Sequence, residues 1–342
     1  MYKILGWLVL LFTLITTPAY AVENRGVVTE ILEENTEYQK IEIETADKEI
    51  IIVENNSGIL ANNIKYKSGD RVLLEMSGDA EGNEFWIITD FERRDGLALL
   101  LIMFIAITVT VARWKGVSSL AGMMFTFVIL FIFVLPAISS GENPILIASV
   151  ASMIIIPVSF FMSHGISKKT ASAVAGSLIA LVITSLLAFI FINLTYLTGL
   201  SSEDAGMLSI NREGMLNMKG LLLAGIVIGV LGVLDDITIS QAGIVNELAK
   251  TEKITKASEL YTRAMNVGKD HITSMVNTLV LAYAGVSLPL LLMFVDNPQP
   301  FGKIINHEMI AEEIVRTLIG SMGLIIAVPI TTYIAARLMG KK

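Results

Sequence analysis

Residues 171–193 read ASAVAGSLIALVITSLLAFIFIN, and these 23 consecutive residues contain no charged side chain. A helix needs about 20 apolar residues to cross the hydrocarbon core of a bilayer, so this stretch is long enough to span a membrane. Six further apolar windows lie at 97–112, 117–138, 144–163, 219–234, 273–295 and 317–336. The sequence therefore predicts an all-α membrane bundle of about seven transmembrane helices over residues 96–342.

The composition of the whole chain agrees with a membrane protein. Its 342 residues are 54% apolar and 17% charged, with a mean hydropathy of +0.68. Soluble domains are about 45–50% apolar and about 25% charged. Residues 23–95 hold 18 acidic and 8 basic residues, so a net charge of −10 is concentrated in an acidic head. These values exclude a cytosolic enzyme, a disordered chain and a basic nucleic-acid-binding protein.

The first 22 residues have the pattern of a secretory signal peptide. One base, Lys3, precedes an apolar run from Ile4 to Ile15, and Ala19-Tyr20-Ala21 forms a small-x-small cleavage site. An uncleaved anchor is the alternative, although the run is short for a membrane span. In both cases the segment that follows is carried across the membrane.

Residues 23–95 predict a small extracytoplasmic β domain. Apolar residues alternate with polar ones, as at Val27, Thr29 and Ile31, and Gly/Asn/Asp clusters separate the runs. About five short antiparallel strands are expected, and an OB-like β-barrel is the simplest way to close them. The domain lacks the basic, aromatic face that binds single-stranded nucleic acid. We therefore expect a plain acidic domain or one that binds a cation or a partner.

The distribution of basic residues predicts the orientation. With the head outside, twelve Lys and Arg residues fall in inner connections and four in outer ones, which agrees with the positive-inside rule and places the C-terminus inside. The inner connection 235–272 has helical spacings on both sides of a polar turn and is expected to form a cytoplasmic helical hairpin.

Two carboxylates stand at the predicted end of the fifth span, where Asp235-Asp236 is followed by polar Gln241. Negative charges at a helix C-terminus oppose the helix dipole, so a partner must compensate them. Asp236 could cap a following helix, or the pair could form a cation or proton site at the cytoplasmic mouth.

The sixth span begins with a polar stripe. Asp270, Ser274 and Asn277 are spaced i, i+4 and i+7, which places them on one helix face, and His271 could titrate near neutral pH. The stripe could act as an N-cap with interhelical hydrogen bonds, or it could form a solute or ion path. Since the fifth and sixth spans are consecutive, we expect this stripe and Asp235 at the same membrane face.

The sequence contains no HExxH motif, no GxxxxGK[ST] phosphate loop and no Ser/His/Asp constellation, so ATP hydrolysis and zinc-protease chemistry are not expected. The absence of cysteine excludes disulfides and thiolate metal sites. We expect no cofactor.

Several runs together resemble the YibE/F family of bacterial multi-pass membrane proteins. They are 229–236 (GVLGVLDD), 268–285 (GKDHITSMVNTLVLAYAG), 288–289 (LP), 312–323 (EEIVRTLIGSMG) and 329–332 (PITT), with 66–72 (YKSGDRV) and 88–93 (ITDFER) in the head. The resemblance implies a multi-pass protein of the bacterial plasma membrane, often taken to be a transporter. It also implies that Asp235, Asp270, His271, Asn277 and Tyr283 are shared motif positions.

The leading hypothesis is a transporter or permease for a small solute or ion, embedded in membrane lipid. A second is a Mg²⁺-dependent polyprenyl-phosphate transferase, because Gly232–Asp236 resembles the GxxDD signature of those enzymes, although the Lys that usually follows is absent. A third is a non-enzymatic accessory or sensing protein whose head binds a partner. Assembly as a homo- or hetero-oligomer stays open.

Overall fold

The computed structural model describes residues 24–35, 38–56, 65–78, 84–251, 256–296 and 299–340, and the predicted signal peptide at 1–22 lies outside them. The chain divides into two units, Met1–Val111 and Ala112–Lys342. Helix α2 (Arg94–Ile129) begins in the first unit and ends in the second. Each unit has a hydrophobic core of its own.

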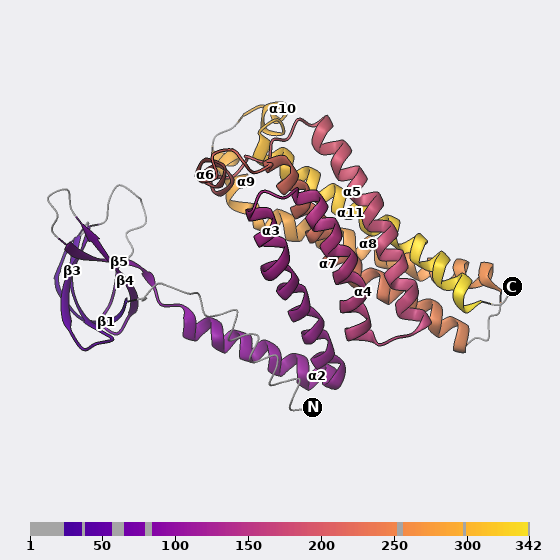
Figure 1. Ribbon diagram of the computed structural model, residues 1–342, viewed down its shortest axis with the longest axis horizontal. Coiled ribbons are helices and arrows are strands. Elements are labelled where there is room, and N and C mark those ends of the chain that lie inside the picture. The colour runs from indigo at the N-terminus through magenta and orange to yellow at the C-terminus, as the bar shows by residue number, and fades with distance from the viewer. Residues whose placement is uncertain are drawn as a thin grey trace. The chain divides into compact units, whose positions relative to one another are not determined.

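An antiparallel five-stranded sheet makes up most of the first unit (Figure 1). Its strands are β1 (Asn24–Glu34), β2 (Tyr38–Thr45), β3 (Ile50–Asn56), β4 (Arg71–Gly78) and β5 (Glu84–Phe91), in the order β3-β2-β1-β4-β5. The apolar positions of the alternating pattern, among them Val28, Ile41, Ile43 and Val72, are buried in the core of this unit. The prediction of five antiparallel strands is therefore confirmed.

The predicted closure of these strands into an OB-like barrel is not what the structure shows. Strands β3 and β5 are the two edges of an open sheet, and no ladder joins them in the part of the chain that the structure describes. Tyr66 and Phe91 pack at the core instead, with ring centroids 4.9 Å apart. Alternation in the sequence marks a buried face, and that pattern is the same in an open sheet and in a barrel.

A buried glutamine ties the loop before β4 to β2. The Gln39 amide nitrogen donates to the Tyr66 carbonyl oxygen at 3.2 Å, and its oxygen accepts from the Tyr66 N–H at 2.9 Å. Both bonds are buried, so a single side chain satisfies both backbone groups of Tyr66. This pairing holds the Tyr66 ring at the core.

The second unit is a helical bundle (Figure 1). After α2 it contains η1 (Leu130–Val134), α3 (Leu135–Ser139), α4 (Pro144–His164), α5 (Lys168–Leu194), α6 (Glu203–Asn211), α7 (Met218–Thr251), α8 (Ala257–Val286), α9 (Leu288–Asp296), α10 (Phe301–Ile304) and α11 (Glu308–Met339). Helix α11 packs against α5, α7 and α8, and α7 packs against α4 and α5. The core of the bundle therefore lies around α7 and α11.

Among the described residues, five helical segments are long and apolar enough to cross a membrane: Arg94–Ser139, α4, α5, α7 and α11. Helices α8 and α9, bent by 62° at their junction, qualify as a sixth, broken span. Seven spans were expected, and length and composition give five or six among these residues. The windows 97–112 and 117–138 fall in one helical segment with a kink at Arg113, where φ is 51° and ψ is −130°. Two helices meet at this kink, so the predicted break between the two windows coincides with it.

Small residues allow α11 to approach its neighbours closely. A Cβ atom on Gly176 of α5 would lie 3.1 Å from the Thr331 Cα and would overlap the Thr331 Oγ1. A Cβ atom on Gly268 of α8 would lie 2.9 Å from a Val328 methyl carbon. Helices that associate in a bilayer use small residues in this way, because backbone proximity is the source of their packing energy.

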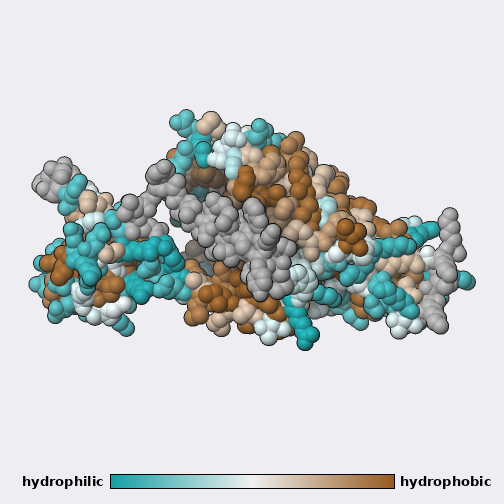
Figure 2. All heavy atoms as spheres, turned by 60° about the horizontal axis from the view of Figure 1, so that its bottom comes forward, coloured by the Kyte–Doolittle hydropathy of each residue, from teal (hydrophilic) through white to brown (hydrophobic). Residues whose placement is uncertain are grey.

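Large apolar side chains cover the outside of the helices. Leu100 and Ile102 in α2, Ile132 in η1 and Leu186 in α5 are all exposed. Figure 2 shows hydrophobic residues over the helical unit and hydrophilic residues gathered toward the end that carries the C-terminus. A soluble monomer rarely exposes contiguous apolar surface on this scale. The helices therefore have the surface of a membrane-embedded protein.

Replacing Gln39 by Leu is expected to destabilise the sheet by about 1–3 kcal/mol, because the buried N–H and C=O of Tyr66 lose their partners. Hydrogen exchange on the full-length protein should show faster exchange in β2 and β4. Lys40→Leu, on the same strand with a partly exposed side chain, is the control. Equal protection in both variants would contradict the role given to Gln39.

Gly176→Ala is expected to destabilise the bundle by about 1–3 kcal/mol, since the new methyl group must displace Thr331. Gly225→Ala on α7 is the matched control, because nothing lies within 4 Å of a Cβ at that position. The control should be neutral, or stabilising by up to about 1 kcal/mol through helix propensity. Reversible unfolding in detergent micelles measures both, and equal effects would show that α5 and α11 are not in close contact there.

Candidate functional site

Helix α7 continues through the acidic pair on which the predicted site was centred. It runs unbroken from Met218 to Thr251, so Asp235 and Asp236 lie within the helix, and Asp236 does not cap a following helix. Beyond the pair, Ile237 and Val245 are fully buried. This apolar face keeps the helix packed against the bundle beyond residue 234, where the drop in hydropathy predicted its end.

The two carboxylates have different surroundings. Asp235 is half-buried, and its Oδ1 is buried with no hydrogen-bond partner among the described residues, whereas Asp236 is exposed. Neighbouring residues on a helix point about 100° apart, so one of the pair enters the bundle while the other leaves it. The two carboxylates therefore do not share the same environment.

Gln241 joins three helices inside the bundle. Its amide nitrogen donates to the Thr332 Oγ1 of α11 at 2.7 Å and to the Ala264 carbonyl oxygen of α8 at 3.1 Å. The side chain is fully buried, and its Oε1 has no partner among the described residues. The residue that the sequence placed after the acidic pair is therefore an interhelical link.

Hydroxyl side chains surround this link. The Ser177 Oγ of α5 and the Thr238 Oγ1 of α7 are hydrogen bonded at 2.7 Å, one helical turn from Gln241. Thr331, next to Thr332 on α11, is fully buried against Gly176, and its Oγ1 has no described partner. Asp235 lies one helical turn before Thr238 on α7. With Asp235 included, we call this group the polar layer; it consists of Ser177, Asp235, Thr238, Gln241, Thr331 and Thr332.

Most of the polar layer was not predicted. Ser177, Thr331 and Thr332 lie in apolar windows, and Thr238 lies just after the window 219–234. Single hydroxyl residues carry little signal there, because they can bond to their own helix. Thr238 and Thr332 do so, each donating to the carbonyl oxygen four residues earlier. The pairs Gly176-Ser177 and Thr331-Thr332, small or hydroxyl residues side by side within apolar helices, were the available signal.

The polar stripe on α8 faces away from the core. Asp270, Ser274 and Asn277 are exposed and His271 is half-buried. Ile272, Met275, Val276 and Leu279, on the opposite side of the helix, pack against the core. No hydrogen bond or ion pair joins the stripe to Asp235 or Asp236 in the part of the chain that the structure describes. The structure thus shows no direct contact between the two groups that were expected to share a membrane face.

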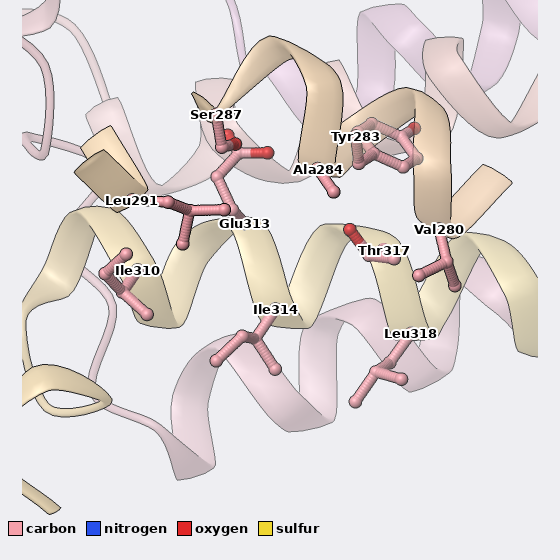
Figure 3. Close-up of a pocket in the computed structure, with 10 residues that line it drawn as sticks. All are labelled: Val280, Tyr283, Ala284, Ser287, Leu291, Ile310, Glu313, Ile314, Thr317 and Leu318. Atoms are coloured by element: carbon pink, nitrogen blue, oxygen red, sulfur yellow. The ribbon is translucent and has the colours of Figure 1, made fainter. Parts of the chain in front are cut away.

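Tyr283 lines a cavity of about 260 Å³ where α8 and α9 meet α11 (Figure 3). The other lining residues are Val280, Ala284, Ser287, Leu291, Ile310, Glu313, Ile314, Thr317 and Leu318. In Figure 3 the Glu313 side chain extends from α11 toward the end of α8 at Ser287. Among the described residues no group of three His, Asp or Glu side chains is arranged to hold a metal ion.

A family model described as YibE/F-like protein matches residues 100–341 of the chain. No curated protein and no solved structure matches. The matched region includes the polar layer, the stripe on α8 and the cavity, and it leaves out the β-sheet.

Gln241→Leu and Thr332→Val are expected to be non-additive, with a coupling energy of about 0.6–1.7 kcal/mol, because they remove the two ends of one buried interhelical hydrogen bond. Unfolding of the two single variants and the double variant in micelles gives the coupling. Thr184→Val combined with Gln241→Leu is the control pair, because Thr184 bonds to its own helix at Ala180. Additive effects in the first pair would contradict the link.

Proposed function

This chain belongs to the YibE/F-like family, and we propose that it is an integral membrane transporter or permease for a small solute or ion. The observation that carries the proposal is the polar layer. Three of its oxygen atoms, the Asp235 Oδ1, the Gln241 Oε1 and the Thr331 Oγ1, are buried without a described partner inside an apolar bundle.

Buried oxygen atoms without a hydrogen-bond partner destabilise the fold unless a donor or a cation binds them. Each costs about 1–3 kcal/mol, and apolar side chains of similar size would avoid that cost in a bundle that served only to hold helices together. Water, a proton or a cation moving through the bundle would satisfy these acceptors. An ionisable group among apolar helices, such as Asp235, supports the same interpretation.

Polar side chains recur along α11 between the cavity and the polar layer. Glu313, Thr317 and Ser321 are four residues apart, so they lie within about 80° of one another, and Thr331 returns to the face of Glu313 after five turns. Thr317 and Thr331 are about 21 Å apart along the helix axis. The Ser321 Oγ, between them, is buried and has no described partner. We place the solute path along this face.

The orientation of the bundle follows from its base-rich end. The Lys168 Nζ donates to the Leu338 carbonyl oxygen at 3.3 Å, and Gly340 lies against Ala257. The connection between α4 and α5, the start of α8 and the end of α11 therefore meet at one end. By the positive-inside rule this end is cytoplasmic in our proposal. The two helices that meet at the Arg113 kink then each cross the membrane, which places the β-sheet outside the cell. Thr331 is then about 12 Å from the cytoplasmic end of α11.

The stripe on α8 favours one second candidate function, that of an accessory subunit. Polar side chains on the outside of a candidate span are costly in lipid, and a helix of another chain would shield Asp270, Ser274 and Asn277. In this alternative the chain transports nothing by itself.

Flux measurements distinguish the two. Purified full-length protein in liposomes should transport at least one member of a panel of ions and small solutes, tested with and without a pH gradient. Asp235→Asn, which removes the buried charge at constant size, should lower this flux at least tenfold, whereas Asp236→Asn at the exposed neighbour should leave it nearly unchanged. Equal flux in both variants would remove Asp235 from the path.

Asp270→Ala tests the earlier expectation that the stripe belongs to the path, and loss of flux with normal folding would support it. The absence of flux for every solute, together with co-purification of a second membrane protein that depends on Asn277, would favour the accessory role.

A further inference from the structure

The cavity lined by Tyr283 lies at a break in the sixth candidate span. Helix α8 ends at Val286, α9 begins at Leu288, and the two are bent by 62°. Pro289 causes part of this break, since it has no N–H to donate to the carbonyl of Gly285 four residues earlier. Broken spans are where many transporters bind their substrates, because the break exposes helix ends inside the membrane.

The cavity combines apolar walls with one carboxylate. Val280, Leu291 and Ile314 provide aliphatic surface, Tyr283 provides an aromatic ring, and Glu313 provides the negative charge. The guanidinium of Arg316 lies 2.5 Å from the Glu312 carboxylate but 3.7 Å from that of Glu313. Arg316 is therefore mainly compensated by Glu312, and the charge of Glu313 is the less neutralised of the two.

The helix ends add to this negative potential. The C-terminal end of α8, with its partial negative charge, lies at the cavity. The positive end of the α11 dipole acts mainly within the first turn of that helix. Glu313 is the sixth residue of α11 and lies beyond this turn. An anion would thus be repelled from the cavity.

We propose that this cavity binds a small organic cation, an ammonium group that carries short apolar substituents. A bare inorganic cation needs oxygen ligands on several sides, which aliphatic walls do not supply. Glu312, Glu313 and Arg316 together carry a net charge of −1, which a neutral apolar molecule would leave uncompensated. An alkylammonium ion matches the carboxylate, the aromatic ring and the aliphatic walls together. This inference rests on the proposed transport function, for which it names the substrate class.

Calorimetric titration of the full-length protein tests the proposal, with nanodiscs of phosphatidylglycerol, a lipid without an ammonium headgroup. Choline should bind saturably, and its neutral isostere 3,3-dimethylbutan-1-ol should bind at least tenfold more weakly. Glu313→Gln should weaken choline binding at least tenfold and leave the alcohol unaffected. Glu142→Gln, an exposed carboxylate in the loop between α3 and α4, should bind choline like the unmodified protein.

Equal binding of choline and the alcohol, or no saturable binding of choline, would overturn the proposal. If Glu313→Gln does not fold, as judged by size-exclusion chromatography, Tyr283→Leu carries the test and should weaken choline more than the alcohol. Loss of choline binding in phosphatidylcholine nanodiscs would show that a lipid headgroup occupies the cavity. It would overturn the proposal that the ligand is a soluble cation. Choline binding without flux of any solute would refute the transport function but not cation binding in the cavity. Flux of other solutes without choline binding would refute cation binding in the cavity but not the transport function.

Discussion

The close approach of α11 to its neighbours is the constraint on which the second unit depends. Gly176 of α5 and Gly268 of α8 leave no room for even a methyl group beside Thr331 and Val328. Helices in a bilayer associate through van der Waals contact and interhelical hydrogen bonds, because lipid tails are as apolar as the side chains they would replace. Small residues at the crossings therefore determine which helices meet and how closely.

This packing explains why the polar regions lie where they do. At the crossing of α5, α7, α8 and α11 the helices are near enough for Gln241 to bond to two of them and for Ser177 to reach Thr238. Nearer the start of α11, where α8 gives way to α9, the contact opens into the cavity beside Glu313. One helix thus carries a tightly packed polar layer toward one end and, toward the other, an open cavity with mostly apolar walls.

Gln241 and the α8 stripe show how far the sequence predicted the site. The position of Gln241 after two carboxylates singled it out, but its partner Thr332 lies 91 residues away on another helix. Helical periodicity placed Asp270, Ser274 and Asn277 on one face. It did not show that this face is exposed, because a polar stripe has the same spacing whether it enters a bundle or leaves it. Only the packing of Met275 and Leu279 against the core reveals the direction.

The sequence by itself determined what depends on neighbours along the chain. Apolar windows predicted membrane embedding, and alternation predicted five strands in the head. Both patterns report, from neighbouring residues alone, which side chains are kept away from water. The tertiary structure decided whether a hydrogen-bonded ladder joins β3 to β5, whether α7 continues past Asp235, and which hydroxyl groups form the polar layer. These features depend on hydrogen bonds and contacts between residues far apart in the chain, and hydropathy carries no record of such contacts.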